Sequence, residues 1–125
     1  MTTTLISMVG HQPLPNLLAI RYLQPDQVLF LYSATGAVVQ RKHNLTELLP
    51  PGCREYQIPP VDPWDIRSIP ATLPEIIRRR RLDETTLIFD LTGGTKAMAI
   101  GLTQVAKQHQ QQHDNEEADG RGEQQ

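Results

Sequence analysis

The sequence predicts an α/β fold in which helices cover both faces of a mainly parallel sheet. Apolar runs of strand length alternate along the chain with segments whose apolar residues recur at helical spacing. The run 27–33 is almost continuously apolar, which is typical of a parallel strand that is buried on both faces. A β-α-β-α-β-α-β-α order of this kind builds a sheet with crossover helices. The expected architecture is a Rossmann-like three-layer sandwich, in a minimal or truncated version.

Turn residues divide the chain into these elements. Gly10 ends the first apolar run, Pro25 ends the first helical segment, and a Pro-Pro-Gly sequence at 50–52 ends the second. Strands are expected at 4–9, 27–33, 53–58 and 86–91, with 53–58 the weakest. Helices are expected at 13–23, within 34–49, in the region that begins at Asp62, and at 95–108.

The region that begins at Asp62 has the sequence of a helix start. Asp62 is a suitable N-cap, and Pro63 then occupies the first helical position. Pro70 and Pro74 interrupt the region, which favours two short helices over one. Trp64 is expected to anchor the packing here, and a ligand-stacking role is its alternative.

Composition and charge restrict the possible functions. The chain has 125 residues and a formal net charge of −2, which argues against a broadly basic surface that coats DNA. Residues 1–108 are expected to form one domain, and 109–125 a disordered polar tail, because this segment has no large apolar residue. Cys53 is the only cysteine, so neither an internal disulfide nor a multi-cysteine metal site is expected. No apolar run reaches membrane-spanning length, and the expected location is the cytoplasm.

The turn after the fourth strand, TGGTK at residues 92–96, is the most informative segment. It places backbone N–H groups, two hydroxyls and an ammonium at the start of a helix, which suits a phosphate or another anion. It is not a Walker loop, because its glycine run is too short and Ala97 follows Lys96 where magnesium needs a hydroxyl. The alternative is a tight turn that needs glycine for its backbone, in which Thr95 only caps the helix. Asp90 precedes the turn and can orient it through hydrogen bonds, and an ordinary strand-end carboxylate is the alternative.

Two other strand ends are expected beside this turn, because ligands on parallel sheets bind beyond the carboxyl ends of the strands. The turns Gly10-His11-Gln12 and Ser33-Ala34-Thr35 follow the first and second strands. His11 is a candidate ligand contact or acid/base, and a plain loop histidine is the alternative.

The segment from Asp90 through the 92–96 turn to Met98 resembles the CRISPR-associated Rossmann-fold (CARF) domains. The opening run LISMVG at 5–10 is similar as well, and the resemblance covers about residues 3–107. It looks closest to the branch with a TGGTK-M turn that is found in cyclic-oligoadenylate-activated type III CRISPR effectors. The resemblance implies a homodimer that binds a cyclic oligoadenylate, usually the four-adenylate ring, across its two-fold axis. No cofactor, metal, DNA partner or membrane is expected.

The same resemblance implies a set of ligand contacts. The glycine-rich turn would contact phosphates and ribose, Met98 would lie near the pocket floor or pack inward, and the other two turns would frame the adenines. The expected contacts are Gly10, His11, Gln12, Ser33, Ala34, Thr35, Thr92, Gly93, Gly94, Thr95, Lys96 and Met98.

Two functions of different class remain open. The first is a sensor or sequestering protein that captures the ring in antiviral defence and acts with a separate effector. The second is a metal-independent ring nuclease, in which His11 is the candidate base and Lys96 stabilises the developing charge. A third possibility is an unrelated Rossmann-like domain for another nucleotide. The sequence contains no effector nuclease domain and no further strands after its last helix, so a truncated effector is also open.

Overall fold

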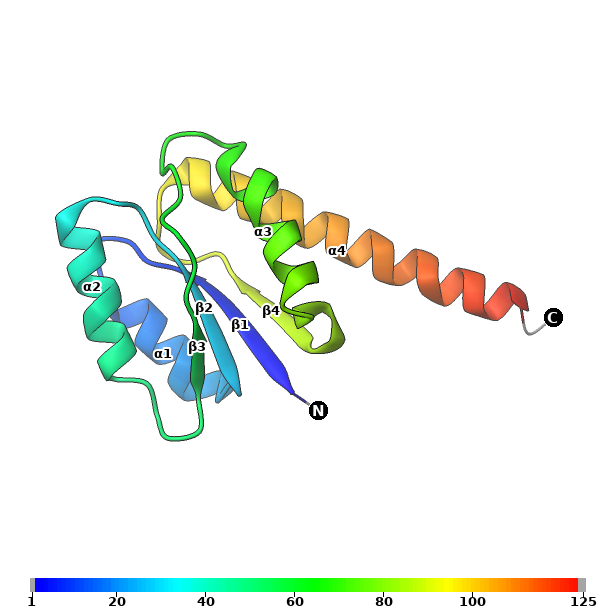
Figure 1. Ribbon diagram of the computed structural model, residues 1–125, viewed down its shortest axis with the longest axis horizontal. Helices are drawn as coiled ribbons and strands as arrows, with labels where there is room; N and C mark the ends of the chain where they lie inside the picture. The colour runs from blue at the N-terminus through cyan, green and yellow to red at the C-terminus, as the bar shows by residue number, and fades with distance from the viewer. Residues whose placement is uncertain (1, 124–125) are drawn as a thin grey trace.

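The computed structural model describes residues 2–123, with side chains as far as residue 116, and confirms the expected fold class (Figure 1). Its strands are β1 (Thr3–Met8), β2 (Gln27–Leu31), β3 (Arg54–Tyr56) and β4 (Thr86–Asp90). They form one sheet in the order β3-β2-β1-β4. All neighbouring strands in this sheet are parallel. Each strand lies close to its expected position, and β3 is short, as its weak pattern indicates.

Two helices cover each face of the sheet, which gives the three expected layers (Figure 1). The helices are α1 (Leu14–Leu23), α2 (Gly36–Glu47), α3 (Ser68–Arg79) and α4 (Lys96–Glu123), and a 3₁₀ turn, η1 (Leu82–Glu84), joins α3 to β4. Helices α1 and α2 lie on one face, and α3 and α4 lie on the other. Over residues 2–123, no helix is both long and apolar enough to cross a bilayer.

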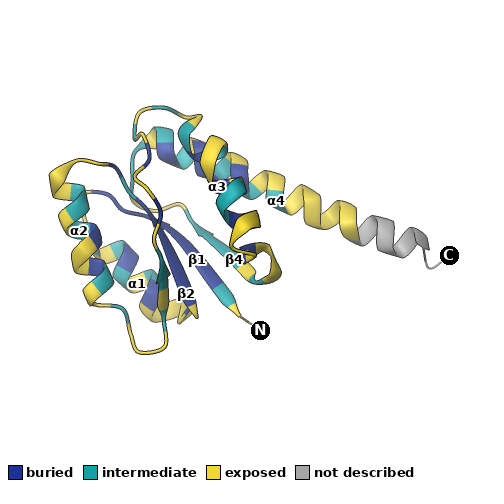
Figure 2. Cartoon of the chain, viewed as in Figure 1, coloured by how far each residue is buried: buried dark blue, intermediate teal, exposed yellow. Residues whose placement is uncertain are grey.

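Alternate residues of β1 supply the two cores between these layers. Leu5, together with Val9 directly after the strand, packs in the core beneath α1 and α2. Ile6 and Met8 point to the other face and pack in the core beneath α3 and α4. All four side chains are buried, and burial of each contributes about 1.5–3 kcal/mol of stability. Figure 2 shows the same pattern, with β1 and β2 as dark buried strands between partly exposed helices.

The helix that the sequence places at Asp62 begins six residues later, at Ser68. Asp62 does not cap a helix, because residues 63–67 are not helical; its carboxylate accepts the backbone N–H of Trp64 at 2.9 Å within a turn. This short-range bond closes a turn, and side chains such as Asp offer it as an alternative to helix capping. The expected helix start at Asp62 and Pro63 is therefore wrong.

The expected pair of short helices is one continuous helix, α3. Pro70 lies in its first turn, where a missing N–H costs nothing. Pro74 lies inside the helix, yet Ile69, Leu73 and Ile77 recur every fourth residue and are all buried against the sheet and α4. The stabilisation from this buried stripe exceeds the cost of a proline inside the helix. The prediction of two helices gave that cost too much weight.

The segment expected to be a disordered tail, 109–125, is helical through Glu123 as the continuation of α4. Residues 124–125 lie outside the described part of the chain. Helix α4 is already nucleated where it packs on the sheet, so each added residue gains a hydrogen bond without a new nucleation cost. His109 also lies against Phe89 of β4, with ring centroids 5.9 Å apart. The composition argument missed this extension because Gln and Glu favour helix even where they bury nothing.

Candidate functional site

The turns after β1 and β4 meet at the point where the chain changes sides in the sheet. Strand β1 has β2 on one side and β4 on the other, and the crevice beyond the carboxyl ends of two such strands is the usual ligand site of open parallel sheets. The two turns touch through their backbones. A Cβ atom on Gly10 would lie 2.6 Å from the backbone nitrogen of Gly94, so residue 10 must be glycine for this contact to form.

A pocket of about 110 Å³ opens at this crevice. It draws on all three strand-end turns, which confirms that they converge. The expected contacts that line it are Gly10, His11, Ser33, Thr35, Gly94, Thr95 and Met98. Its remaining lining residues are Val9, Val38, Pro63 and Trp64. The expected contacts that do not line it are Gln12, Ala34, Thr92, Gly93 and Lys96.

The conformation of the glycine-rich turn is fixed by the backbone angles of its two glycines and by hydrogen bonds to Asp90. Gly93 and Gly94 have φ angles of 82° and 70°, a region that favours glycine. The Asp90 carboxylate accepts hydrogen bonds from both the backbone N–H and the hydroxyl of Thr92, at 3.0 and 2.6 Å. The expected orienting role of Asp90 is thus confirmed. Because both donors of Thr92 are used within the turn, this residue can offer a ligand only its hydroxyl lone pairs.

The Thr95 hydroxyl has two structural roles. It accepts the backbone N–H of Met98 at 3.1 Å, which makes it the cap of α4. It also donates to the carbonyl oxygen of Pro63, in the loop that precedes α3. Its single hydrogen is therefore committed, and Thr95 cannot also donate to a phosphate in this conformation. The capping alternative from the sequence is the role that the geometry shows.

Three helix N-termini make this edge of the sheet electropositive. Helices α1, α2 and α4 each follow a strand that ends here, and none has an acidic residue in its first turn. Their partial positive charges are therefore not neutralised from within the helices, and the Asp90 carboxylate that binds Thr92 is a negative charge beside the start of α4. Lys96 is exposed at the start of α4, and among the described residues it forms no ion pair. Arg41 of α2 adds a second cation, since its guanidinium donates to the Gly10 carbonyl at 3.3 Å. The arrangement suits a polyanionic ligand.

His11 is exposed at the pocket edge, where it can contact a bound molecule. A general base is normally oriented by a third group, but no hydrogen bond to the His11 ring is found in the described part of the chain. Met98 is buried at the base of the pocket, which agrees with both expectations for it. Among the side chains that the structure describes, those of residues 2–116, no cluster of three or more metal-ligating groups occurs.

Sequence reasoning missed two features of the pocket. Arg41 lies 31 positions from Gly10 in the sequence and gave no motif. Trp64 was expected to anchor packing, with ligand stacking as the alternative; the residue is 81% exposed at the pocket rim, so the packing role is wrong and the alternative stays open. One feature of the sequence indicated that Trp64 is not a core residue: it is isolated in a proline-rich, acidic loop.

The fold and the pocket define a class of protein: a Rossmann-like binding domain whose site lies at the switch point of a parallel sheet. The chain belongs to the Card1 CARF domain family, whose model matches residues 4–114. The family match thus includes all four strands and the turn at 92–96. No curated protein matches the chain significantly.

Two solved structures are similar to this domain. One is Can2 from Sulfobacillus thermosulfidooxidans in complex with cyclic tetra-adenylate, with 25% identity and a TM-score of 0.65 over 86% of this chain. The other is a type III CRISPR defence DNA nuclease activated by cyclic oligoadenylate, with 19% identity and a TM-score of 0.58 over 82% of this chain. The chain spans 30% and 17% of the lengths of these two proteins. At 19% identity, the second likeness concerns the fold alone.

Proposed function

We propose that this chain binds a cyclic oligoadenylate, with cyclic tetra-adenylate as the preferred ring, as a sensor or sequestering domain of type III CRISPR antiviral defence. The observation that carries the proposal is the glycine-rich turn at 92–96, which opens α4 at the switch point of a CARF domain. Can2, to which the chain is similar, has been solved with cyclic tetra-adenylate. We assign the chain further to the branch with a TGGTK-M turn, on the residues from 92 to 98.

The backbone of the turn and Lys96 supply the phosphate-binding groups. The first N–H groups of a helix have no intrahelical partner, and the Thr95 hydroxyl takes only that of Met98 in α4. The N–H groups of Lys96 and Ala97 therefore remain for an anion, together with the Lys96 ammonium. Lysine acts as a flexible point charge, which suits a phosphate whose position varies around a ring.

We propose a homodimer, which the size of the pocket and the symmetry of the ligand favour. A volume of about 110 Å³ is well below the roughly 300–1,000 Å³ of common small-molecule sites, so one chain accommodates only part of a cyclic tetranucleotide. A ring with two-fold symmetry needs the same donors twice, and an isologous dimer provides them. We propose that the dimer acts in the cytoplasm, without metal or cofactor. Its output passes to a separate effector or to further domains of a larger protein.

The alternative function is slow cleavage of the ring, which the exposure of His11 at the pocket favours. The ribose 2′-hydroxyl would attack the adjacent phosphorus and its proton would pass to His11. The P–O5′ bond would break, the 5′-oxygen would take a proton from water, and the ring would open to a 2′,3′-cyclic phosphate. Lys96 would stabilise the charge that develops on the phosphate oxygens. Capture is the primary proposal, because no hydrogen bond that would orient His11 is found among the residues that the structure describes.

The test combines binding and product analysis with radiolabelled cyclic tetra-adenylate. Lys96→Ala is expected to weaken binding about 10-fold or more, since a hydrogen bond to a charged group contributes about 1.5–3 kcal/mol. Lys107→Ala is the matched control, because Lys107 is also exposed on α4 but lies three turns further along. Absence of binding to the unaltered chain, or equal affinities of the two variants, would contradict the proposal. Linear product that His11→Ala abolishes would favour the nuclease.

A further inference from the structure

Trp64 presents a large apolar surface to solvent at the rim of the pocket. Its side chain is 81% exposed, although the same loop places Val61 in the core. Most of the stabilisation that burial of an indole provides is therefore absent at this position. A single exposed aromatic needs no explanation by itself. This one lines a pocket that also contains the phosphate-suited turn.

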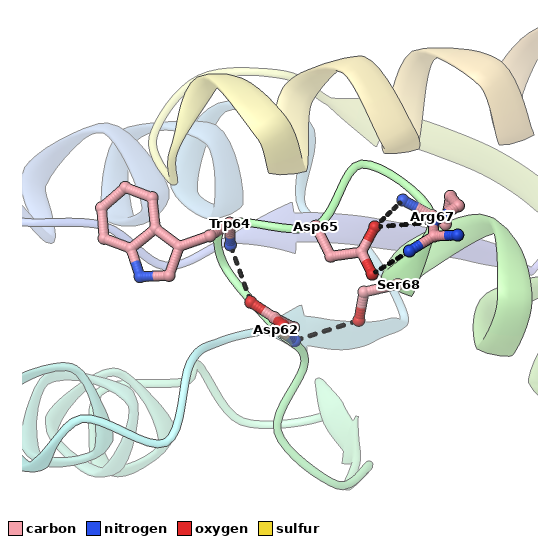
Figure 3. Close-up of polar contacts among 5 residues, drawn as sticks. All are labelled: Asp62, Trp64, Asp65, Arg67 and Ser68. Carbon is pink, nitrogen blue, oxygen red and sulfur yellow. Dashed lines mark hydrogen bonds and ion pairs between the residues drawn. The ribbon is translucent and has the colours of Figure 1, made fainter.

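The loop that carries Trp64 is fixed by hydrogen bonds on both sides of the indole (Figure 3). Asp62 accepts the N–H of Trp64 at 2.9 Å and donates its own N–H to the Ser68 hydroxyl at 3.0 Å. Asp65 accepts both the backbone N–H and the guanidinium of Arg67, at 2.9 and 3.1 Å. These bonds from Arg67 hold the pKa of the Asp65 carboxyl below its ordinary value. In Figure 3 the indole points away from all of these contacts.

Two contacts also tie this loop to α4, which begins at the glycine-rich turn. The Thr95 hydroxyl donates to the Pro63 carbonyl, directly before Trp64. One helical turn and a half along α4, a Cβ on Gly101 would lie 2.9 Å from the Ile66 carbonyl oxygen, so the loop rests on the helix backbone. The indole is thus held at a set position relative to the start of α4.

We propose that Trp64 stacks on a purine base of the nucleotide whose phosphate binds at the glycine-rich turn. The inference rests on the proposed function and adds a residue that selects for a base rather than for phosphate alone. Tryptophan offers the strongest π face of the side chains, and every base has a face to stack on it. Pre-ordering of the loop lowers the entropy cost of stacking, since little motion remains to be lost. The Thr95–Pro63 bond makes phosphate anchor and base platform one rigid unit.

The chain contains a single tryptophan, so its intrinsic fluorescence reports on residue 64 alone. Titration with cyclic tetra-adenylate is expected to quench this emission and shift it to shorter wavelength, as water leaves the indole. Adenosine monophosphate is expected to quench it at higher concentration, and inorganic phosphate is expected to have no effect. Equilibrium dialysis with radiolabelled cyclic tetra-adenylate measures binding independently of the fluorescence.

Variants separate stacking from structure. Trp64→Ala is expected to lower affinity about 5- to 150-fold for each stacked base, the range that base–aromatic stacking of about 1–3 kcal/mol represents. Trp64→Phe keeps an aromatic plane and is expected to bind within a few-fold of the unaltered chain. Tyr22→Ala is the matched control, since Tyr22 is an 88% exposed aromatic on α1 outside the pocket lining. Because Trp64 is exposed, all variants are expected to fold with unchanged melting temperatures.

The outcomes distinguish this inference from the proposed function. Binding by dialysis without quenching, and with Trp64→Ala equal to Tyr22→Ala, overturns the stacking role but leaves cyclic oligoadenylate binding intact. Failure of dialysis to detect cyclic tetra-adenylate overturns the proposed function, and the adenosine monophosphate titration then decides on stacking. If adenosine monophosphate quenches the Trp64 emission and inorganic phosphate does not, the stacking role is supported. If neither compound quenches the emission, the stacking role is overturned.

Discussion

Replacing Gly10 with alanine tests whether the turns after β1 and β4 depend on a backbone contact. The new Cβ would lie 2.6 Å from the nitrogen of Gly94 and 3.4 Å from the carbonyl carbon of Gly93. Ordinary contact begins near 3.4 Å, so the two turns must separate by about 0.8 Å. Backbone atoms cannot yield by changing rotamer, and overpacking of this kind costs about 1–3 kcal/mol. For a domain of this size, the expected fall in melting temperature is roughly 3–15 °C.

The assay is thermal unfolding followed by circular dichroism, with cyclic tetra-adenylate binding measured on the same samples. Gly36→Ala is the matched control, because nothing lies within 4 Å of a Cβ at this position and Gly36 begins a helix. This control is expected to be neutral or stabilising by up to about 1 kcal/mol. Gly10→Ala is also expected to weaken binding, since it displaces the phosphate turn. A melting temperature within 1–2 °C of the unaltered chain would refute the steric argument.

Two further predictions concern groups outside the pocket. The Lys42 ammonium lies 2.5 Å from the Glu55 carboxylate, and both side chains are only 6% exposed. Glu55→Leu alone is therefore expected to lower the free energy of unfolding, measured in urea, by about 3–5 kcal/mol, because it leaves the buried Lys42 ammonium unpaired. Adding Lys42→Met is expected to restore most of this loss. A double variant no more stable than Glu55→Leu would count against the prediction. Burial, and secondarily Asp26, raise the pKa of the Cys53 thiol. At pH 8 the folded chain is expected to react with iodoacetamide more slowly than the urea-unfolded chain, because the thiolate fraction is smaller, and equal rates by mass spectrometry would disprove it.

Most of the sheet and the convergence of its turns could be predicted from the sequence. Each depends on local information: apolar runs mark β1, β2 and β4, and glycine at 93 and 94 marks a turn with positive φ. Parallel topology then brings the strand ends together without any knowledge of contacts. These are the parts of the fold in which one segment is enough to specify one element.

The incorrect predictions concern segments whose structure depends on contacts with residues that are distant in the sequence. Asp62 and Pro63 have the pattern of a helix start, but the Pro63 carbonyl accepts a hydrogen bond from Thr95, 32 positions away. The segment remains a loop, and Trp64 is exposed on it. Pro74 is tolerated inside α3 because the sheet and α4 bury the opposite face of the helix. None of these partners is visible within a local window of the sequence, so local pattern could not foresee the outcome.

The length of α4 has a mechanical consequence. Its 28 residues form a rod of about 42 Å that starts at the 92–96 turn and extends beyond the body of the domain (Figure 1). Pivoting such a rod by about 5° at its start moves its far end by about 4 Å, a gain set by length alone. If the proposed ligand shifts the 92–96 turn by less than an ångström, the far end of the helix is expected to move by a distance comparable to the length of a side chain.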